Sequence, residues 1–236
     1  MHIQFKPVQL RLGQRVIDFF RSLGERGHLT RMQDVLGTYV HAHMLGNDSG
    51  EPALITAGHQ DNIVAAQTLL AAGADPNAVD EAGCSALGWA VRYNRINMAI
   101  LLLSAGADPN SESVRPGGLS VLMEVCGEGR VKLLLALLAA GADPNLQSMA
   151  ARKTAMMMAA ARGQLQAVKI LLAAGADLNI EDSDGNTALD LAELARHVGF
   201  AFIGDDPKHI EIVRLLTATK QDQLQPPKEP LDFLKK

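Results

Sequence analysis

The chain has 236 residues, of which 47% are apolar and only 4% are aromatic. Its 22 basic and 26 acidic residues give a net charge of −4, which argues against sequence-independent nucleic-acid binding, since such binding relies on a basic face. The longest apolar run, residues 133–142, is far short of a membrane span, and no secretory signal is visible. Because two cysteines do not make a disulfide framework, we expect a cytoplasmic protein.

A seven-residue motif recurs along the chain. It reads Ala71-Ala72-Gly73-Ala74-Asp75-Pro76-Asn77 and returns at 104–110, 139–145 and 173–179, the last with Leu178 in place of the proline. The motif glycines lie 33, 35 and 34 residues apart. This period predicts a stack of units of about 34 residues, each too small to bury its apolar face alone. The expected product is an elongated solenoid.

Each motif is expected to close a helix. In the last copy the helix carries apolar residues at Leu165, Val168 and Leu171, a stripe that a 3.6-residue period places on one face. The motif glycines fit a left-handed C-terminal cap, and the prolines prevent the helix from continuing.

A shorter helix is expected upstream of each such helix. A hydroxyl suited to an N-cap precedes each of them, at Ser85, Ser120, Thr154 and Thr187. The segments 78–84 and 180–186, rich in aspartate and glycine, are predicted to form projecting turns.

These segments resemble the ankyrin repeat. The resemblance rests on Asp184-Gly185-Asn186-Thr187-Ala188-Leu189, and on Ala160-Ala161-Arg162-Gly163-Gln164-Leu165 followed by Ala173-Ala174-Gly175-Ala176-Asp177. It covers roughly residues 48–217 in five units and implies an all-α solenoid of about six helix-turn-helix units with projecting β-turn loops.

One family feature is missing. Ankyrin units typically carry a histidine in the first helix, and this chain has Ile55, Gly88, Met123, Met157 and Asp190 at that position. We therefore expect the associated hydrogen bonds to be absent from every unit, with some loss of stability.

The expected domain boundaries follow from the period. Residues 1–46 form an N-terminal segment whose Gly27-His28-Leu29 resembles a degenerate capping repeat. The five units are expected at about 47–80, 81–113, 114–148, 149–181 and 182–219, the last with an insertion at 199–208. Residues 220–236 are expected to be a flexible tail.

No catalytic constellation emerges, and no cofactor or metal is expected. Cys126 is predicted to be a packed structural thiol, and Cys84 an accessible thiol in a turn without an activating base. His41 and His43 are spaced for different sides of a helix, which disfavours metal binding together with His59.

The resemblance implies binding through the concave face, which we define as the projecting turns together with the exposed side of the first helices. The residues expected there are Glu51, His59, Gln60, Glu81, Trp89, Arg92, Tyr93, Arg95, Arg115, Leu119, Glu128, Arg130, Arg152, Lys153, Arg162, Asp182, Ser183 and Asn186.

Four arginines, Arg92, Arg95, Arg130 and Arg162, fall near the junction of the two helices and are expected to line up beside Tyr93. Such a row favours a protein partner with an acidic contact surface, although Glu128 would neutralise part of it, and solvated charge is an equal alternative. Trp89 is expected to be mostly buried. The segment 200–203 is expected either to cover the C-terminal unit or to dock a partner.

The expected function is non-catalytic protein binding without nucleic acid or membrane. Three uses stay open: a cytosolic adaptor or scaffold, an immunity or inhibitor protein that covers the active site of a toxin or enzyme, and a secreted effector acting on a host protein.

Overall fold

The computed structural model describes residues 52–113, 117–198 and 206–224. Within these ranges the chain forms ten helices and no extended strand, and isolated bridges join Val79 to Ser85 and Glu112 to Ser120 in the projecting turns. The helices pair as α3 (Ala53–His59) with α4 (Ile63–Ala71), α5 (Ala86–Arg92) with α6 (Ile96–Ser104), α7 (Val121–Glu128) with α8 (Val131–Ala139), α9 (Ala155–Ala161) with α10 (Leu165–Ala173), and α11 (Ala188–Val198) with α12 (Pro207–Leu224).

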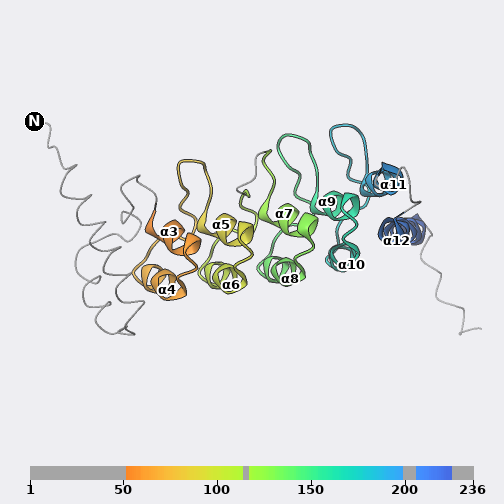
Figure 1. Cartoon of the computed structure of the whole chain (residues 1–236). Helices are drawn as coiled ribbons and strands as arrows, with labels where there is room; N and C mark the ends of the chain where they lie inside the picture. Colours follow the sequence, from red (N-terminus) through yellow and green to blue (C-terminus); the bar gives the residue numbers. More distant parts are fainter. Residues whose placement is uncertain (1–51, 114–116, 199–205, 225–236) are drawn as a thin grey trace, which may run out of the picture.

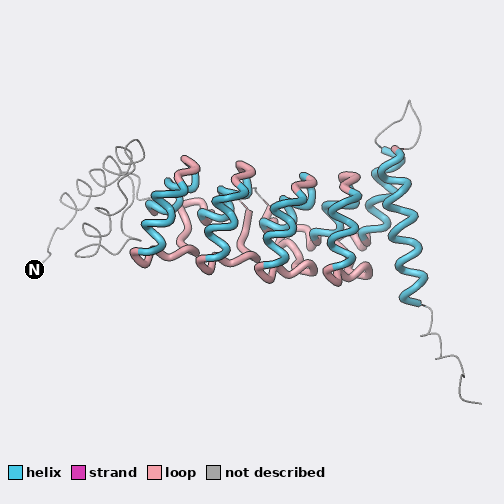
Figure 2. Tube along the Cα trace, turned by 90° about the horizontal axis from the view of Figure 1, so that it is seen from below, coloured by secondary structure: helices cyan, strands magenta, loops and turns pink. Residues whose placement is uncertain are grey.

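The pairs stack side by side in an elongated row (Figure 1). The first helix of each pair forms one layer, the second helix forms the layer beneath it, and long loops project from the side of the first helices. Seen from below, the units repeat with little change until the longer α12 (Figure 2). The expected all-α repeat solenoid is confirmed.

The second helices end as the motif predicts. Gly73, Gly106, Gly141 and Gly175 have φ angles of 89°, 92°, 90° and 82°, in the left-handed region that favours glycine. The amide of the residue after each glycine donates to a carbonyl of the last helical turn, as Ala142 does to Leu137 over 3.0 Å. This bond satisfies an acceptor that the helix end would otherwise leave open.

The first helices begin at the expected hydroxyls. The Oγ of Ser85 accepts a hydrogen bond from the amide of Gly88, and Ser120 and Thr154 accept from the amides of Met123 and Met157. We expected no unit to form a hydrogen bond through the residue at the histidine position, and this is wrong. The Sδ atoms of Met123 and Met157 each accept from the cap amide over 3.4 Å.

The last unit makes the strongest bond of this kind. The Oδ2 of Asp190 accepts from both the amide and the hydroxyl of Thr187, over 2.8 and 2.6 Å. These bonds hold the pKa of Asp190 below its usual value. A sulfur or carboxylate acceptor thus replaces the missing histidine in three units. No such acceptor exists at Ile55, which has an apolar side chain, or at Gly88, which has none.

The core runs without interruption along the stack. Each first helix is buried on the side that faces the second helices, as at Leu87, Leu122 and Met156, and each second helix buries its inner stripe, as at Leu102 and Leu137. Small residues such as Ala90 and Ala159 are fully buried between neighbouring units. Alanine therefore allows the helices to approach closely.

The motif also links the units. The Oδ1 of Asn77, Asn110 and Asn145 accepts a hydrogen bond from the amide of the motif aspartate in the next unit, over 2.7, 2.8 and 2.8 Å. Within each copy the aspartate carboxylate accepts from the amide of the asparagine two residues on, as Asp108 does from Asn110 over 2.9 Å. The aspartate thus shapes the turn and the asparagine ties it to its neighbour.

The C-terminal unit differs from expectation at two boundaries. α12 begins at Pro207, within the predicted insertion, and continues to Leu224, five residues into the predicted tail. Pro207 suits the first turn of a helix, and no proline interrupts the sequence before Pro226. The first helix of this unit, α11, runs to Val198, directly before the predicted insertion. The segments 199–205 and 225–236, like the N-terminal segment 1–46, lie outside the described residues.

His209 fastens α12 to the preceding unit. Its Nδ1 lies 2.8 Å from the carboxylate of Asp206, and its Nε2 lies 3.2 Å from the carbonyl oxygen of Ala161 at the end of α9. Its ring also packs on Gly163, where a Cβ would come within 3.1 Å of the imidazole. Among the described helices, none is both long and apolar enough to cross a membrane.

Candidate protein-binding surface

In two of the first helices, α5 and α7, the fourth residue contacts the projecting loop. In α5 the indole Nε1 of Trp89 donates to the Oδ2 of Asp80 in the loop over 2.8 Å. In α7 the hydroxyl of Ser113 in the next loop donates to the Oε2 of Glu124. This position therefore forms the floor of the concave face, where loop and helix meet.

The floor carries an aromatic cluster between the first two described units. The rings of Trp89 and Tyr93 stack with centroids 5.8 Å apart and planes 15° apart, and the ring of His59 meets Trp89 edge-on at 4.2 Å. Trp89 is half-buried and packs against the core, whereas Tyr93 is 51% exposed. Trp89 is thus less buried than expected, and it supports one face of an accessible tyrosine.

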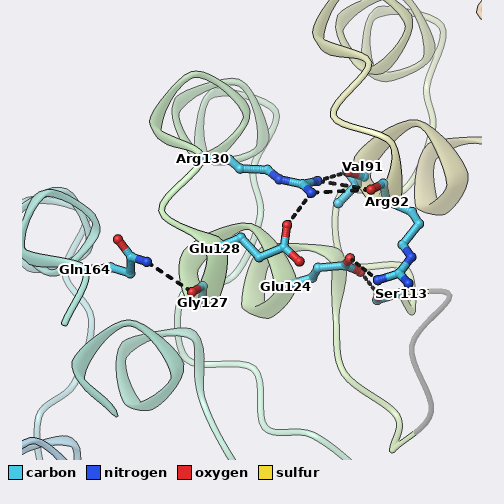
Figure 3. A network of polar contacts seen from close by, with 8 residues as sticks. All are labelled: Val91, Arg92, Ser113, Glu124, Gly127, Glu128, Arg130 and Gln164. Carbon is cyan, nitrogen blue, oxygen red and sulfur yellow. Dashed lines mark hydrogen bonds and ion pairs between the residues drawn. The ribbon is translucent and has the colours of Figure 1, made fainter. Parts of the chain in front are cut away.

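The arginine row is largely engaged in internal contacts (Figure 3). The guanidinium of Arg130 donates to the carbonyl oxygens of Val91 and Arg92 in the preceding unit and pairs with Glu128. Arg92 lies 3.7 Å from Glu124, whose side chain is fully buried. The expectation that Glu128 neutralises part of the row is confirmed, and Glu124 does the same from the floor.

The other two arginines of the row, Arg95 and Arg162, differ in whether they have a carboxylate partner. Arg95 pairs with Asp61 over 3.4 Å. Arg162 lies over Gly127 of the preceding unit, where a Cβ would come within 3.2 Å of its guanidinium nitrogen. Among the described residues, Arg162 forms no ion pair.

The other predicted contact residues divide into exposed and structural ones. Gln60, Glu81, Arg152 and Ser183 are exposed, whereas Leu119 and Lys153 are half-buried. Asp182 is only 4% exposed, because its Oδ1 accepts from the amides of Asp184 and Asn186 over 2.9 Å within the loop. Asp182 therefore shapes the loop. Glu51 and Arg115 lie outside the described residues.

The cysteines are both buried. Cys126 lies in the core of α7, where burial raises the pKa of its thiol to about 12, as expected of a packed thiol. The prediction of an accessible Cys84 is wrong. Its residue is only 5% exposed, and burial, followed by the charges of Asp80 and Glu112, raises the pKa of the thiol.

The histidines bring no metal site together in the described part of the chain. His59 packs its ring against Trp89, and His41 and His43 lie outside the described residues. No group of three or more histidine, cysteine, aspartate or glutamate side chains with metal-binding geometry occurs among the described residues.

Sequence reasoning missed much of the floor. Glu124, Met158 and Leu191 occupy the position of Trp89 in their own units, and Leu194 lies one turn beyond Leu191. Leu194 is 58% exposed. The signal was present in the sequence, because every first helix has the same register after its cap.

A family model described as "Ankyrin repeats (3 copies)" matches the chain over residues 25–113 and 122–226. The chain therefore belongs to the ankyrin repeat family. Ankyrin repeats are generally protein–protein interaction modules and are typically non-catalytic. The comparison with curated proteins finds no match.

Proposed function

We propose that this chain binds a protein partner through its concave face, with Tyr93 as an anchor. The observation that carries the proposal is the stack of Tyr93 on Trp89, whose indole is held in place by Asp80. A tyrosine that is half exposed and already fixed on one face loses little rotamer freedom on binding. Tyrosine is also over-represented among the residues that dominate binding energy.

Arg162 is the arginine of the row that an acidic partner would contact most favourably. Three of the four row arginines have a carboxylate partner in the chain, at Glu124, Asp61 and Glu128. An acidic group of the partner would therefore gain most by approaching Arg162, which has no competing carboxylate among the described residues. A partner that contacts both Tyr93 and Arg162 would span three units of the concave face.

A paired comparison tests the proposal. Immobilised wild-type chain, Tyr93→Ala and Ile100→Ala would capture partners from an extract of the source cells, followed by quantitative mass spectrometry. Ile100 lies on the second helix α6 and is 49% exposed, so it controls for the loss of an accessible apolar group. We expect a partner that wild type and Ile100→Ala retain and that Tyr93→Ala loses at least tenfold. Equal capture by all three would contradict the proposal.

The identity of the captured protein would then separate an adaptor from an inhibitor or immunity protein. An enzyme or toxin whose activity falls when the chain binds favours inhibition. A host protein favours a secreted effector.

A further inference from the structure

The loop before α9 has an arginine at a backbone position where the other loops have glycine (Figure 1). The loops that lead into α5, α7 and α11 have a glycine two residues before the cap hydroxyl, and these glycines, Gly83, Gly118 and Gly185, have φ angles of 79°, 62° and 80°. The equivalent residue before α9 is Arg152, with a φ angle of 51°. A side chain with a Cβ is disfavoured in this left-handed region, so this loop keeps a strained residue where glycine would fit without strain.

Arg152 also differs from the other side chains that adopt a positive φ. In the described ranges the other non-glycine residues of this kind are Asp61 and Asn94, whose short polar side chains tolerate the left-handed region. Arginine lacks this tolerance. Because strained residues that persist in proteins cluster at functional sites, the strain indicates that the guanidinium itself has a role.

Hydrogen bonds to the backbone hold Arg152 in this conformation. Its amide donates to the carbonyl oxygen of Ser148 over 3.0 Å, and its own carbonyl oxygen accepts from the Nε2 of Gln147 over 2.9 Å. The same Nε2 donates to the carbonyl oxygen of Glu181 over 3.0 Å, which ties the loop to the next one. The guanidinium is exposed and donates to the Oε1 of Gln147 over a longer distance, 3.4 Å. The short contacts of the loop are therefore made by the backbone of Arg152, and the guanidinium stays accessible.

The charges of this unit are all positive. Residues 144–176 contain Arg152, Lys153, Arg162 and Lys169 and no aspartate or glutamate, although the whole chain has a net charge of −4. We call Arg152, Lys153 and Arg162, which lie at the two ends of α9, the α9 cations. Among the described residues, no carboxylate forms an ion pair with any of the three. Because α9 has seven residues, these ends are about 10 Å apart.

The α9 cations suit an acidic peptide segment better than a nucleic acid. A guanidinium pairs with a carboxylate through two parallel hydrogen bonds, so two arginines can bind two separate acidic side chains. A nucleic-acid backbone needs a longer run of phosphate contacts. It would continue past α9 to Glu128 in the preceding unit and to the exposed Glu181 in the next loop, where carboxylates repel phosphate.

We propose that the α9 cations bind an acidic segment of the protein partner, and that Arg152 determines specificity for it. This proposal rests on the proposed function of the concave face and names the chemistry of the partner there. Arg152 adds a second guanidinium at the opposite end of α9 from Arg162. An extended segment with carboxylates about 10 Å apart contacts both arginines, and the strain at Arg152 is retained for this contact.

Binding of poly-L-glutamate to the full chain at low ionic strength tests this proposal by isothermal titration calorimetry. Arg152→Gly removes the guanidinium and supplies the residue that the other loops have at this backbone position. Lys169→Gln, at an exposed position of α10 in the other layer of the same unit, is the matched control for the loss of one positive charge. Single-stranded oligo-dT is the nucleic-acid probe, and thermal melts measure stability.

We expect Arg152→Gly and Arg162→Gln each to weaken the binding of poly-L-glutamate roughly threefold, as for the loss of an exposed ion pair, with Lys169→Gln unchanged. Because glycine relieves the strain, Arg152→Gly should melt at or above the wild-type temperature. A lower melting temperature would show that the side chain is kept for folding and would overturn the proposal.

Three binding results would also overturn it: unchanged affinity of Arg152→Gly, equal weakening by Lys169→Gln, or tighter binding of oligo-dT than of poly-L-glutamate. Capture of a partner that depends on Tyr93 is measured separately. A negative result with poly-L-glutamate therefore leaves protein binding through the concave face intact.

Discussion

At the scale of single residues, the motif asparagines explain why the seven-residue motif repeats so closely. Three of the four, Asn77, Asn110 and Asn145, each join a turn to the next unit, 31 to 33 residues away in sequence. The asparagine is not needed to end the helix, because the glycine cap and the proline do this already. The asparagine is needed because the amide of the following motif aspartate would otherwise lack a partner.

Replacing Asn110 by alanine should lower the free energy of unfolding by about 1 kcal/mol, because the amide of Asp143 then loses its acceptor. Asn97→Ala, at an exposed position of α6, is the control and should change stability by less than about 0.5 kcal/mol. Urea denaturation measures both. Equal stability of the two variants would show that the link contributes nothing.

The arginines of the concave face have different structural roles. Arg92→Glu should destabilise the fold by about 1–2 kcal/mol, because it removes a cationic partner of the buried Glu124 and adds a like charge beside it. Arg162→Glu should stay within about 0.5 kcal/mol of wild type. Thermal melts of the two variants decide between these roles. A melting temperature lowered as much by the second change as by the first would contradict the pairing.

At the scale of elements, sequence reasoning predicted what depends on local chemistry. The hydroxyl caps, the glycines with positive φ and the apolar stripes are each set within one helix, and all were found where expected. The ion pairs of Arg92 and Arg130 were not predictable in this way. They depend on distances between atoms of different units, as in the bond from Arg130 to Val91, 39 residues apart.

The burial of Cys84 illustrates the same limit. Its place in a projecting turn suggested exposure, but the turn folds its carboxylate Asp80 back to accept from the amide of Cys84 over 2.9 Å. The acceptors that replace histidine at Met123 and Met157 were missed for a different reason. A methionine looks like a core residue in sequence, and only its conformation brings the sulfur to the cap amide.

The buried thiol of α7 makes the stability of the array depend on pH. The pKa of Cys126 is about 12 in the folded chain, against an ordinary value of 9.0. Between these values the folded state keeps a proton that the unfolded state has lost, so stability falls as pH rises above about 9. Relative to Cys126→Ala, the wild-type chain should lose about 1 kcal/mol between pH 8 and pH 10.

Urea denaturation at the two pH values measures this difference. Alkylation by iodoacetamide provides a second readout, because both thiols should react only after unfolding. Parallel pH dependence of wild type and Cys126→Ala would mean that the thiol is not protected.

At the scale of the whole molecule, the stack provides one continuous surface built from equivalent positions. The position that carries Trp89 in α5 carries Glu124 in α7, Met158 in α9 and Leu191 in α11. The chemistry of the concave face therefore changes along the row, from aromatic through charged to apolar. A partner that contacts several units meets a different set of side chains in each. These differences give specificity without any change of fold.

We propose that this face, and not the second-helix layer, binds the partner. Hydrogen–deuterium exchange of the chain with and without its captured partner distinguishes the two layers. We expect slower exchange on binding in residues 78–93 and 155–162, which hold the loop, the aromatic stack and Arg162, with α4, α6, α8 and α10 unchanged. Protection confined to those second helices would contradict it.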